Sequence, residues 1–339
     1  MIEPPEKSRR AIAAWLLVCC GMIYAMAVIG AVTRLTESGL SIMEWAPIRG
    51  AMPPTSEAEW RRLFAIYQTI DEYREHNDGM TLEQFQSIFW WEYIHRLWGR
   101  LIGAVYALPF AWFLLRRRVP DHLKAPLWIA MGLGALQGAV GWYMVSSGFG
   151  ERTDVSQYRL VLHLGLALVI YSYLLWLALG LLIRREPTPG AARLRRPLVA
   201  LTALVALTIA SGGFVAGLNA GRFFNTFPLM NGHLIPPGLW GMDPWLRNLF
   251  ENPITAQFDH RALAMTTTAA ALALWGWGRA RAPELRRALD LLAVAALAQL
   301  GLGISALLLA VPVWLGAAHQ AGAIALLTAS LYALRSTRT

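Results

Sequence analysis

The sequence is poor in two features on which many enzymes depend, cysteine and charge. It has two cysteines in 339 residues, and 15% of its residues are charged. Cys19 and Cys20 are adjacent, so they can neither close a useful disulfide loop nor form a spaced set of metal ligands. We interpret them as lipid-facing or packing residues. The chain also has no H-E-x-x-H motif and no set of two histidines and a carboxylate on one predicted helix, which argues against the common mononuclear zinc and iron sites.

Apolar residues, in contrast, make up 56% of the chain and occur in long uncharged runs. A helix needs about 20 such residues to cross the roughly 30 Å hydrocarbon core of a membrane. The first run is long and lacks a small-residue cleavage site, so we expect a retained helix and not a signal peptide. The fold class is therefore all-α, a polytopic membrane protein. Eight transmembrane helices are predicted, near 11–33, 94–115, 125–146, 159–183, 198–218, 258–278, 288–311 and 316–334.

The connections between these runs alternate in charge. One side, which includes both ends of the chain, has 18 of the 30 basic residues and six of the 21 acidic ones, whereas the other side has 12 basic and 15 acidic residues. The positive-inside rule then places both termini in the cytoplasm. The formal charge of +9 is thus a topology signal, and no nucleic-acid partner is expected. Glu3 and Glu6 are unlike an acid-poor mitochondrial presequence, so we expect a bacterial inner membrane.

Two segments on the outer side, about 34–93 and 219–257, are much longer than the other connections. Long ordered connections often carry function, so the outer face is where we expect the site. Within the first segment, Thr55–Tyr73 and Thr81–Tyr93 each start with a suitable N-cap and mix apolar with charged residues. They are predicted to be surface helices.

The second half of the chain repeats the first. His95-Arg96 opens the second predicted helix and His260-Arg261 the sixth, while His163 and His319 open the fourth and the eighth. The third and seventh helices each contain a glutamine followed by glycines, which are expected to allow close helix approach: Gln137, Gly138 and Gly141, and Gln299, Gly301 and Gly303. The repeat predicts two tandem four-helix bundles of the same orientation, residues 1–190 and 191–339.

The repeated histidines lie near the outer ends of the even-numbered helices. Ionisable groups inside a membrane are costly and usually mark a site. Two facing imidazoles at similar depth are what six-coordinate haem iron requires, and this pairing favours haem over another metal. His95 with His163 would form one site, and His260 with His319 the other. Arg96, Arg100, Arg159 and Arg261 lie near them and would contact the haem propionates, although interfacial snorkelling explains any single one equally well.

One asymmetry distinguishes the halves. Glu92 precedes His95 by three residues and shares its helix face, whereas the matching position before His260 is Gln257. A carboxylate beside a haem can accept a proton or stabilise a developing cation, which electron transfer alone does not require. We therefore assign chemistry to the first half and a redox or structural haem to the second. The alternative is that Glu92 forms a solvated surface pair with Arg96 or Arg100.

Three groups of residues together resemble the haem A synthase family of cytochrome oxidase assembly proteins: Thr33 to Ser41 (TRLTESGLS), Trp90 to Arg96 (WWEYIHR) and the repeated histidines. The resemblance covers nearly the whole chain. It implies an oxidoreductase of haem biosynthesis that oxidises the ring D methyl group of haem O to a formyl group by successive hydroxylations, which makes haem A for cytochrome oxidase. Some members have a cysteine pair in the first outer segment; this chain has none there and belongs to the cysteine-free type.

The resemblance also implies roles for the site residues. His95 and His163 would be the axial ligands of the substrate haem O, His260 and His319 those of the iron of a haem b cofactor, and Glu92 would be catalytic. Haem O synthase is the implied source of the substrate. The electron donor or acceptor and the formation of a homo-oligomer stay open.

Two other functions fit parts of the pattern. A membrane cytochrome with two haems b that only transfers electrons would have symmetric halves, so the difference between Glu92 and Gln257 argues against it. A transporter built from repeated bundles would have its polar groups near the middle of the membrane, whereas the histidines here lie toward one face.

Overall fold

The structure is a computed structural model that describes residues 6–46, 48–149, 153–183 and 188–337. Its architecture is all-helical, as predicted. The described residues form no regular strand, and their β-type pairing is an isolated bridge between Met230 and His233. Short helices α2 (Glu57–Tyr67), α3 (Asp71–His76) and α8 (Asn248–Glu251) lie in the two long connections. The long helices are α1 (Glu6–Leu35), α4 (Leu82–Leu115), α5 (Asp121–Val145), α6 (Gln157–Leu182), α7 (Pro189–Gly217), α9 (Pro253–Arg281), α10 (Arg286–Leu308) and α11 (Val313–Arg335).

Among the described residues, seven helices are long and apolar enough to cross a membrane by length and composition. They coincide with seven of the predicted spans, and this identifies a multi-pass membrane protein. The helix at the remaining predicted span, α9, is long but more polar. It contains the Asp259-His260-Arg261 sequence and three consecutive threonines at 266–268, and these lower its hydropathy. The prediction of eight crossings therefore stays a prediction.

The helix boundaries follow from local capping. Thr81 caps α4, and Thr81 and Gln84 form a reciprocal capping box. Thr188 and Asn252 cap α7 and α9, each followed by a proline at the first helical position. The prediction of a separate surface helix at Thr81–Tyr93 was wrong, because this stretch is the first part of α4 and continues without a break into the apolar run.

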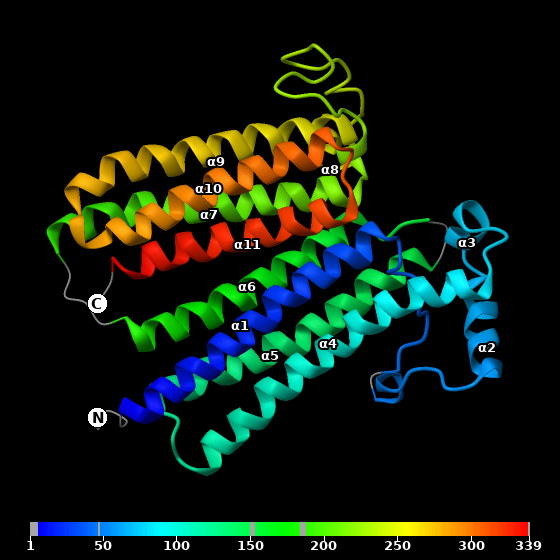
Figure 1. Ribbon diagram of the computed structural model, residues 1–339, viewed down its shortest axis with the longest axis horizontal. Coiled ribbons are helices and arrows are strands. Elements are labelled where there is room, and N and C mark those ends of the chain that lie inside the picture. The colour runs from blue at the N-terminus through cyan, green and yellow to red at the C-terminus, as the bar shows by residue number, and fades with distance from the viewer. Residues whose placement is uncertain (1–5, 47, 150–152, 184–187, 338–339) are drawn as a thin grey trace.

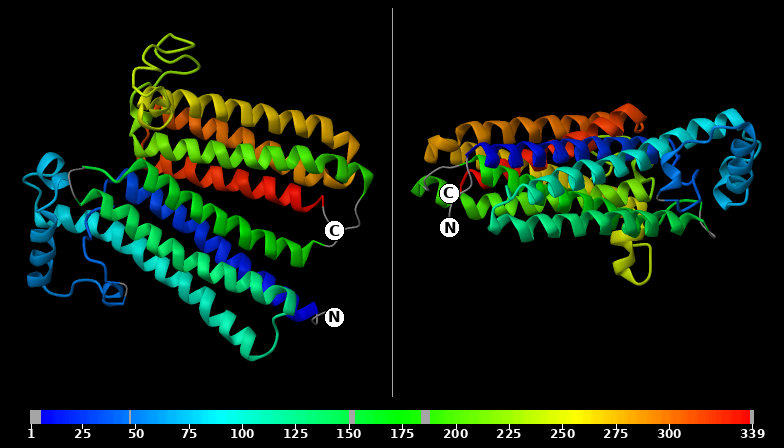
Figure 2. Two further views of the ribbon diagram at one scale, coloured as in Figure 1. Left: turned by 180° about the vertical axis from the view of Figure 1, so that it is seen from behind. Right: turned by 90° about the horizontal axis from the view of Figure 1, so that it is seen from below.

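The helices of each half pack on one another. α1 contacts α4 and α6 while α5 contacts both α4 and α6, and α7 contacts α9 and α11 while α10 contacts α9 and α11. α1 with α11 and α6 with both α7 and α11 join the two sets, which lie side by side in Figures 1 and 2. The first residues of α1 and the last of α11 lie at one end of the molecule, and α2, α3 and α8 lie at the other (Figure 1).

The interior is apolar, and so is much of the surface. Cys19 and Cys20 are both free and buried, so they pack in the core and do not face lipid. Large side chains such as Leu108, Val169 and Val294 are more than half exposed on the outside of the long helices. An apolar surface of this kind is expected where hydrocarbon is the solvent.

Candidate functional site

Each of the four repeated histidines packs edge-on against a glycine of a neighbouring helix. A Cβ atom added to Gly30 would lie 3.1 Å from Cε1 of His95, and one added to Gly141 would lie 2.9 Å from Cε1 of His163. In the second half, the corresponding distances are 2.9 Å from Gly212 to His260 and 2.8 Å from Gly303 to His319. The same contact therefore occurs four times, and it uses all eight long helices, in the pairs α1–α4, α5–α6, α7–α9 and α10–α11.

The two second-half imidazoles face each other across the bundle. The ring centres of His260 and His319 are 6.3 Å apart, and their planes are almost perpendicular, at 87°. A bond from imidazole nitrogen to a metal is about 2 Å long. If two imidazoles bind one metal ion between them, the distance between their ring centres is the sum of two metal–nitrogen bonds and the two distances from nitrogen to ring centre. This sum is roughly 6 Å. The observed spacing fits one iron atom between the rings.

Glutamines from the preceding helix contact the second and the fourth of these histidines, His163 and His319. Nε2 of Gln137 lies 3.2 Å from Nδ1 of His163, and Nε2 of Gln299 lies 3.1 Å from Nδ1 of His319. The other amide atom, Oε1, is buried without a hydrogen-bond partner in both glutamines within the described structure. A histidine that binds iron through Nε2 has its proton on Nδ1, and turning the Gln299 amide over would direct its Oε1 at that proton. Nε2 of Gln137 also donates to the backbone carbonyl of His163 at 3.1 Å, a hydrogen bond that a turned amide would lose. These paired glutamines can therefore orient iron-binding histidines.

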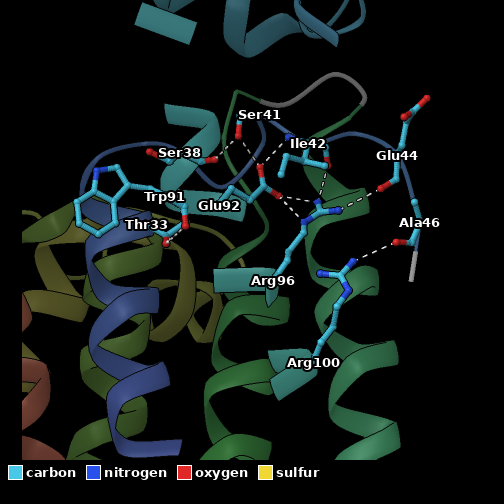
Figure 3. Close-up of polar contacts among 10 residues, drawn as sticks. All are labelled: Thr33, Ser38, Ser41, Ile42, Glu44, Ala46, Trp91, Glu92, Arg96 and Arg100. Atoms are coloured by element: carbon cyan, nitrogen blue, oxygen red, sulfur yellow. Dashed lines mark hydrogen bonds and ion pairs between the residues drawn. The ribbon is translucent and has the colours of Figure 1, made fainter. Parts of the chain in front are cut away.

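Glu92 lies among polar contacts between α4 and the segment that follows α1 (Figure 3). The residue is 2% exposed. Oε2 accepts hydrogen bonds of 2.7 Å from Oγ of Ser41 and from the backbone N–H of Ile42, and Oε1 pairs with Arg96 at 2.6 Å. Sequence reasoning left open a solvated pair with Arg96 or Arg100; the pair with Arg96 exists but is buried. A carboxylate with this many donors is held in one position.

The arginines of the first half anchor the outer segment. Arg96 donates to the carbonyl oxygens of Ile42 and Glu44, and Arg100 donates to that of Ala46 at 3.0 Å (Figure 3). Arg159 donates to the Tyr143 carbonyl at 2.7 Å, and its guanidinium lies 3.9 Å from the centre of the Tyr143 ring. These contacts attach the cations to the connections at the end of the helices opposite the chain termini. Propionate binding by Arg96, Arg100 and Arg159 stays a prediction.

In the second half, Gln257 and Arg261 occupy the positions that Glu92 and Arg96 have in the first half. Arg261 donates to the carbonyl oxygens of Phe224 and Thr226, at 2.6 and 2.8 Å, and Gln257 donates to Phe224 at 3.1 Å. The residues three before and one after the histidine thus hold the outer segment in both halves. Only the first half has a carboxylate there, as the sequence indicated.

The residues present fit haem better than a bare metal ion. Among the described residues, no three histidine, cysteine, aspartate or glutamate side chains gather as a metal site. The facing imidazoles of His260 and His319, and the glycines that let a helix close on each of the four rings, suit a planar group with axial ligands.

Several site residues escaped sequence reasoning. Gln137 and Gln299 were noted as repeat markers, but their contact with the histidines was not foreseen, and Gly30, Gly212 and Ser211 were not considered. A comparison of helices α1 and α7 around Gly30 and Gly212 would have been the available signal. Of the glycines that follow the glutamines, Gly141 and Gly303 make the predicted close approach, to His163 and His319, whereas the prediction was wrong for Gly138 and Gly301, which have open space around them.

Taken together, the long apolar helices and the repeated histidine pairs define a multi-pass membrane protein with two candidate haem sites. A family model described as a cytochrome oxidase assembly protein matches residues 13–331. Relatives named Heme A synthase include those of Rhodospirillum centenum, 51% identical over 99% of this chain and 92% of that protein, and Nitrosomonas eutropha, 48% identical over 96% and 93%. The relative from Nitrosospira multiformis is 49% identical over 96% and 92%. The chain belongs to the haem A synthase family of cytochrome oxidase assembly proteins.

Proposed function

We propose that this chain oxidises the ring D methyl group of haem O to the formyl group of haem A, with His95 and His163 as ligands of haem O and His260 and His319 as ligands of a haem b cofactor. As a member of the haem A synthase family the chain is an oxidoreductase of haem biosynthesis. The haem b iron, when bound, supplies one-electron redox chemistry. The observation that carries the assignment of the halves is Glu92, buried beside His95 where the second half has Gln257.

The geometry gives Glu92 a specific task. Its two oxygens accept hydrogen bonds from Ser41, Ile42 and Arg96, so the carboxylate can neither rotate freely nor exchange its partners for bulk water. A fixed negative group stabilises positive charge that develops at a substrate carbon, and it can orient a water molecule toward that carbon. Arg96 pairs with the carboxylate at 2.6 Å while the carboxylate stays buried.

We also propose the architecture and topology that this function uses. The chain would cross the bacterial inner membrane eight times as two tandem four-helix bundles, residues 1–190 and 191–339, with both termini cytoplasmic and the haem sites toward the periplasm. The packing of helices within each half and the fourfold glycine–histidine contact support the repeat. The charge bias of the connections supports the orientation.

The experiment is to express wild type and Glu92→Gln with a source of haem O, and to quantify haems O, A and B in purified membranes by chromatography and mass. Gln is the residue that the second half has at this position, so the variant removes the charge with little change in shape. Glu44→Gln is the matched control, because Glu44 lies in the same outer segment and its pair with Arg62 is exposed.

Wild type and Glu44→Gln should form haem A, whereas Glu92→Gln should accumulate haem O or a hydroxylated intermediate with at least a hundredfold less haem A, the size of effect expected for a lost electrostatic stabiliser. Haem B alone in every variant would identify an electron-transfer cytochrome. Equal haem A in wild type and Glu92→Gln would overturn the role of Glu92.

A further inference from the structure

The histidines differ in what their second ring nitrogen contacts. In the second half, Oγ of Ser211 lies 2.9 Å from Nδ1 of His260. The same hydroxyl also lies 2.7 Å from the carbonyl oxygen of Thr208, to which it must donate its only proton. Ser211 therefore accepts a hydrogen bond from Nδ1–H of His260. This fixes the tautomer in which Nε2 has a free lone pair for a metal.

The first half lacks this partner. Gly30 and Gly212 make the same contact with His95 and His260, so they define the register of α1 against α7. In that register Ile29 occupies the position of Ser211. Nδ1 of His95 is buried and has no hydrogen-bond partner within the described residues. Within the described residues, Nδ1 of His95 contacts no polar side chain, whereas Nδ1 of each of the other three histidines does.

A hydrogen-bond acceptor at Nδ1 changes a histidine as a ligand. It holds the ring orientation and makes the imidazole a stronger electron donor, and its loss typically lowers metal affinity by about 10–100-fold. A stronger donor also stabilises the ferric state of a haem and lowers its reduction potential. The contact with Ser211 should therefore tighten the second-half site relative to the first.

We propose that Ser211 is a positioning residue that makes His260 a firm axial ligand, and that Ile29 leaves His95 as a weak one, so that the first-half site releases its haem and the second-half site retains it. This inference rests on the proposed function, in which the first-half haem is substrate and product and must leave, whereas the second-half haem is a resident cofactor. The second ligand of the first half, His163, is contacted by Gln137 and would hold the substrate during the reaction.

The test compares Ser211→Ala with the rescue variant Ser211→Thr, which keeps a hydroxyl, and with the control Ser330→Ala. Ser330 is also a buried helical serine that donates to the carbonyl three residues before it, Leu327, but within the described structure it makes no hydrogen bond with a histidine. The reciprocal variant is Ile29→Ser, with Ile29→Ala as its control for lost volume. The readouts are an optical redox titration of the purified haem-loaded protein and the rate of haem transfer to apomyoglobin.

We expect Ser211→Ala to raise the potential of one of the two haems and to speed its loss about 10–100-fold, while Ser211→Thr and Ser330→Ala match wild type. Ile29→Ser should lower the potential of the other haem and slow its release relative to Ile29→Ala. If Ser211→Ala fails to fold, the Ile29 pair alone decides.

Unchanged potentials and release rates in Ser211→Ala, or in Ile29→Ser against Ile29→Ala, would overturn the inference and leave haem A formation as a separate question. Neither readout depends on haem A formation. Wild-type protein that purifies without any haem would overturn the inference together with the proposed function.

Discussion

At the scale of single residues, the glycines beside the histidines determine how closely the helices approach each imidazole. Gly303→Ala would put a methyl group 2.8 Å from Cε1 of His319, well inside van der Waals contact, so the ring must move. We expect an overpacking cost of about 1–3 kcal/mol and loss of one haem per protein. Gly301→Ala is the matched control on the same helix, because nothing lies within 4 Å of Gly301.

Haem content by pyridine haemochrome and thermal unfolding of the purified protein would measure both effects. Gly141→Ala and Gly138→Ala repeat the comparison in the first half, where the distance to His163 is 2.9 Å and the control position is again open. If Gly303→Ala and Gly301→Ala retained equal haem, the contact would not be needed for the site.

A second residue-scale feature lies outside the membrane, in α3. Glu72 is 5% exposed, and its Oε2 has no hydrogen-bond partner in the described structure. Burial, with the negative charges of Asp154, Glu92 and Glu37, raises the pKa of the Glu72 carboxyl to about 8. The folded protein therefore holds a proton there that the unfolded chain releases near pH 4.

This linkage predicts the pH dependence of stability. Between about pH 4 and pH 8 the folded state holds a proton on Glu72 that the unfolded chain does not. The free energy of unfolding therefore falls as pH rises through this range, by at most about 1.4 kcal/mol per pH unit. The melting temperature of Glu72→Gln should fall less between pH 6 and pH 9 than that of wild type. Glu75→Gln, an exposed carboxyl on the same helix, should behave like wild type. Parallel curves for Glu72→Gln and wild type would show that Glu72 is ionised in the fold.

At the scale of elements, α4 and α9 each hold the long outer connection of their own half. The two hydrogen bonds from Arg261 to Phe224 and Thr226 attach the connection between α7 and α9 to the end of α9. Arg261→Leu removes both bonds and leaves two carbonyls without their donor, which should cost about 1–3 kcal/mol locally. Chymotrypsin should then cleave this connection faster than in wild type.

The control is Arg222→Leu, in the same connection, whose contact with Glu37 is 3.7 Å long and exposed. Cleavage followed by mass spectrometry would locate the cut. Equal rates for Arg261→Leu and Arg222→Leu would mean that other contacts, such as that from Gln257 to Phe224, hold the connection alone.

The elements also show how far sequence reasoning reached. The apolar runs predicted the position of every long helix, because long helices with an apolar face or surface need runs that composition reveals directly. Seven of them also have the length and hydropathy to cross a membrane, and α9 does not reach that hydropathy. The start of α4 was missed, because Thr81–Tyr93 changes in composition while its backbone continues as one helix. Capping by Thr81 marks where the helix begins, but no local signal marks that it does not end before the apolar run.

For the site, the repeat predicted which residues matter but not what holds them. The spacing of the histidines and the Glu92/Gln257 difference can be read along the chain. The partner of His260, Ser211, lies 49 residues away on a different helix, and the difference between Ser211 and Ile29 has meaning only once α1 and α7 are aligned by their contacts. Tertiary packing of this kind has no signature in a single sequence.

At the scale of the whole molecule, the ends of α1 and α11 share one end of the helices and the outer segments share the other (Figure 1). In the proposed topology, which follows the charge bias, the first end lies in the cytoplasm. The native cysteines suit a labelling test of this orientation, because Cys19 and Cys20 are 0% and 4% exposed and should not react with a membrane-impermeant maleimide. Glu59 in α2 and His122 at the start of α5 are exposed at opposite ends.

In intact spheroplasts, Glu59→Cys should therefore be labelled and His122→Cys should not, whereas both should react after the membrane is permeabilised. Reaction with detergent present shows that each new thiol is accessible, which makes the missing label on His122→Cys meaningful. The reverse pattern would place Glu92, the histidines and the outer segments on the cytoplasmic side, and the haem sites would then open toward the compartment opposite to the one proposed. Labelling of both variants in intact spheroplasts would contradict any arrangement in which α4 and the helices around it cross the membrane fully.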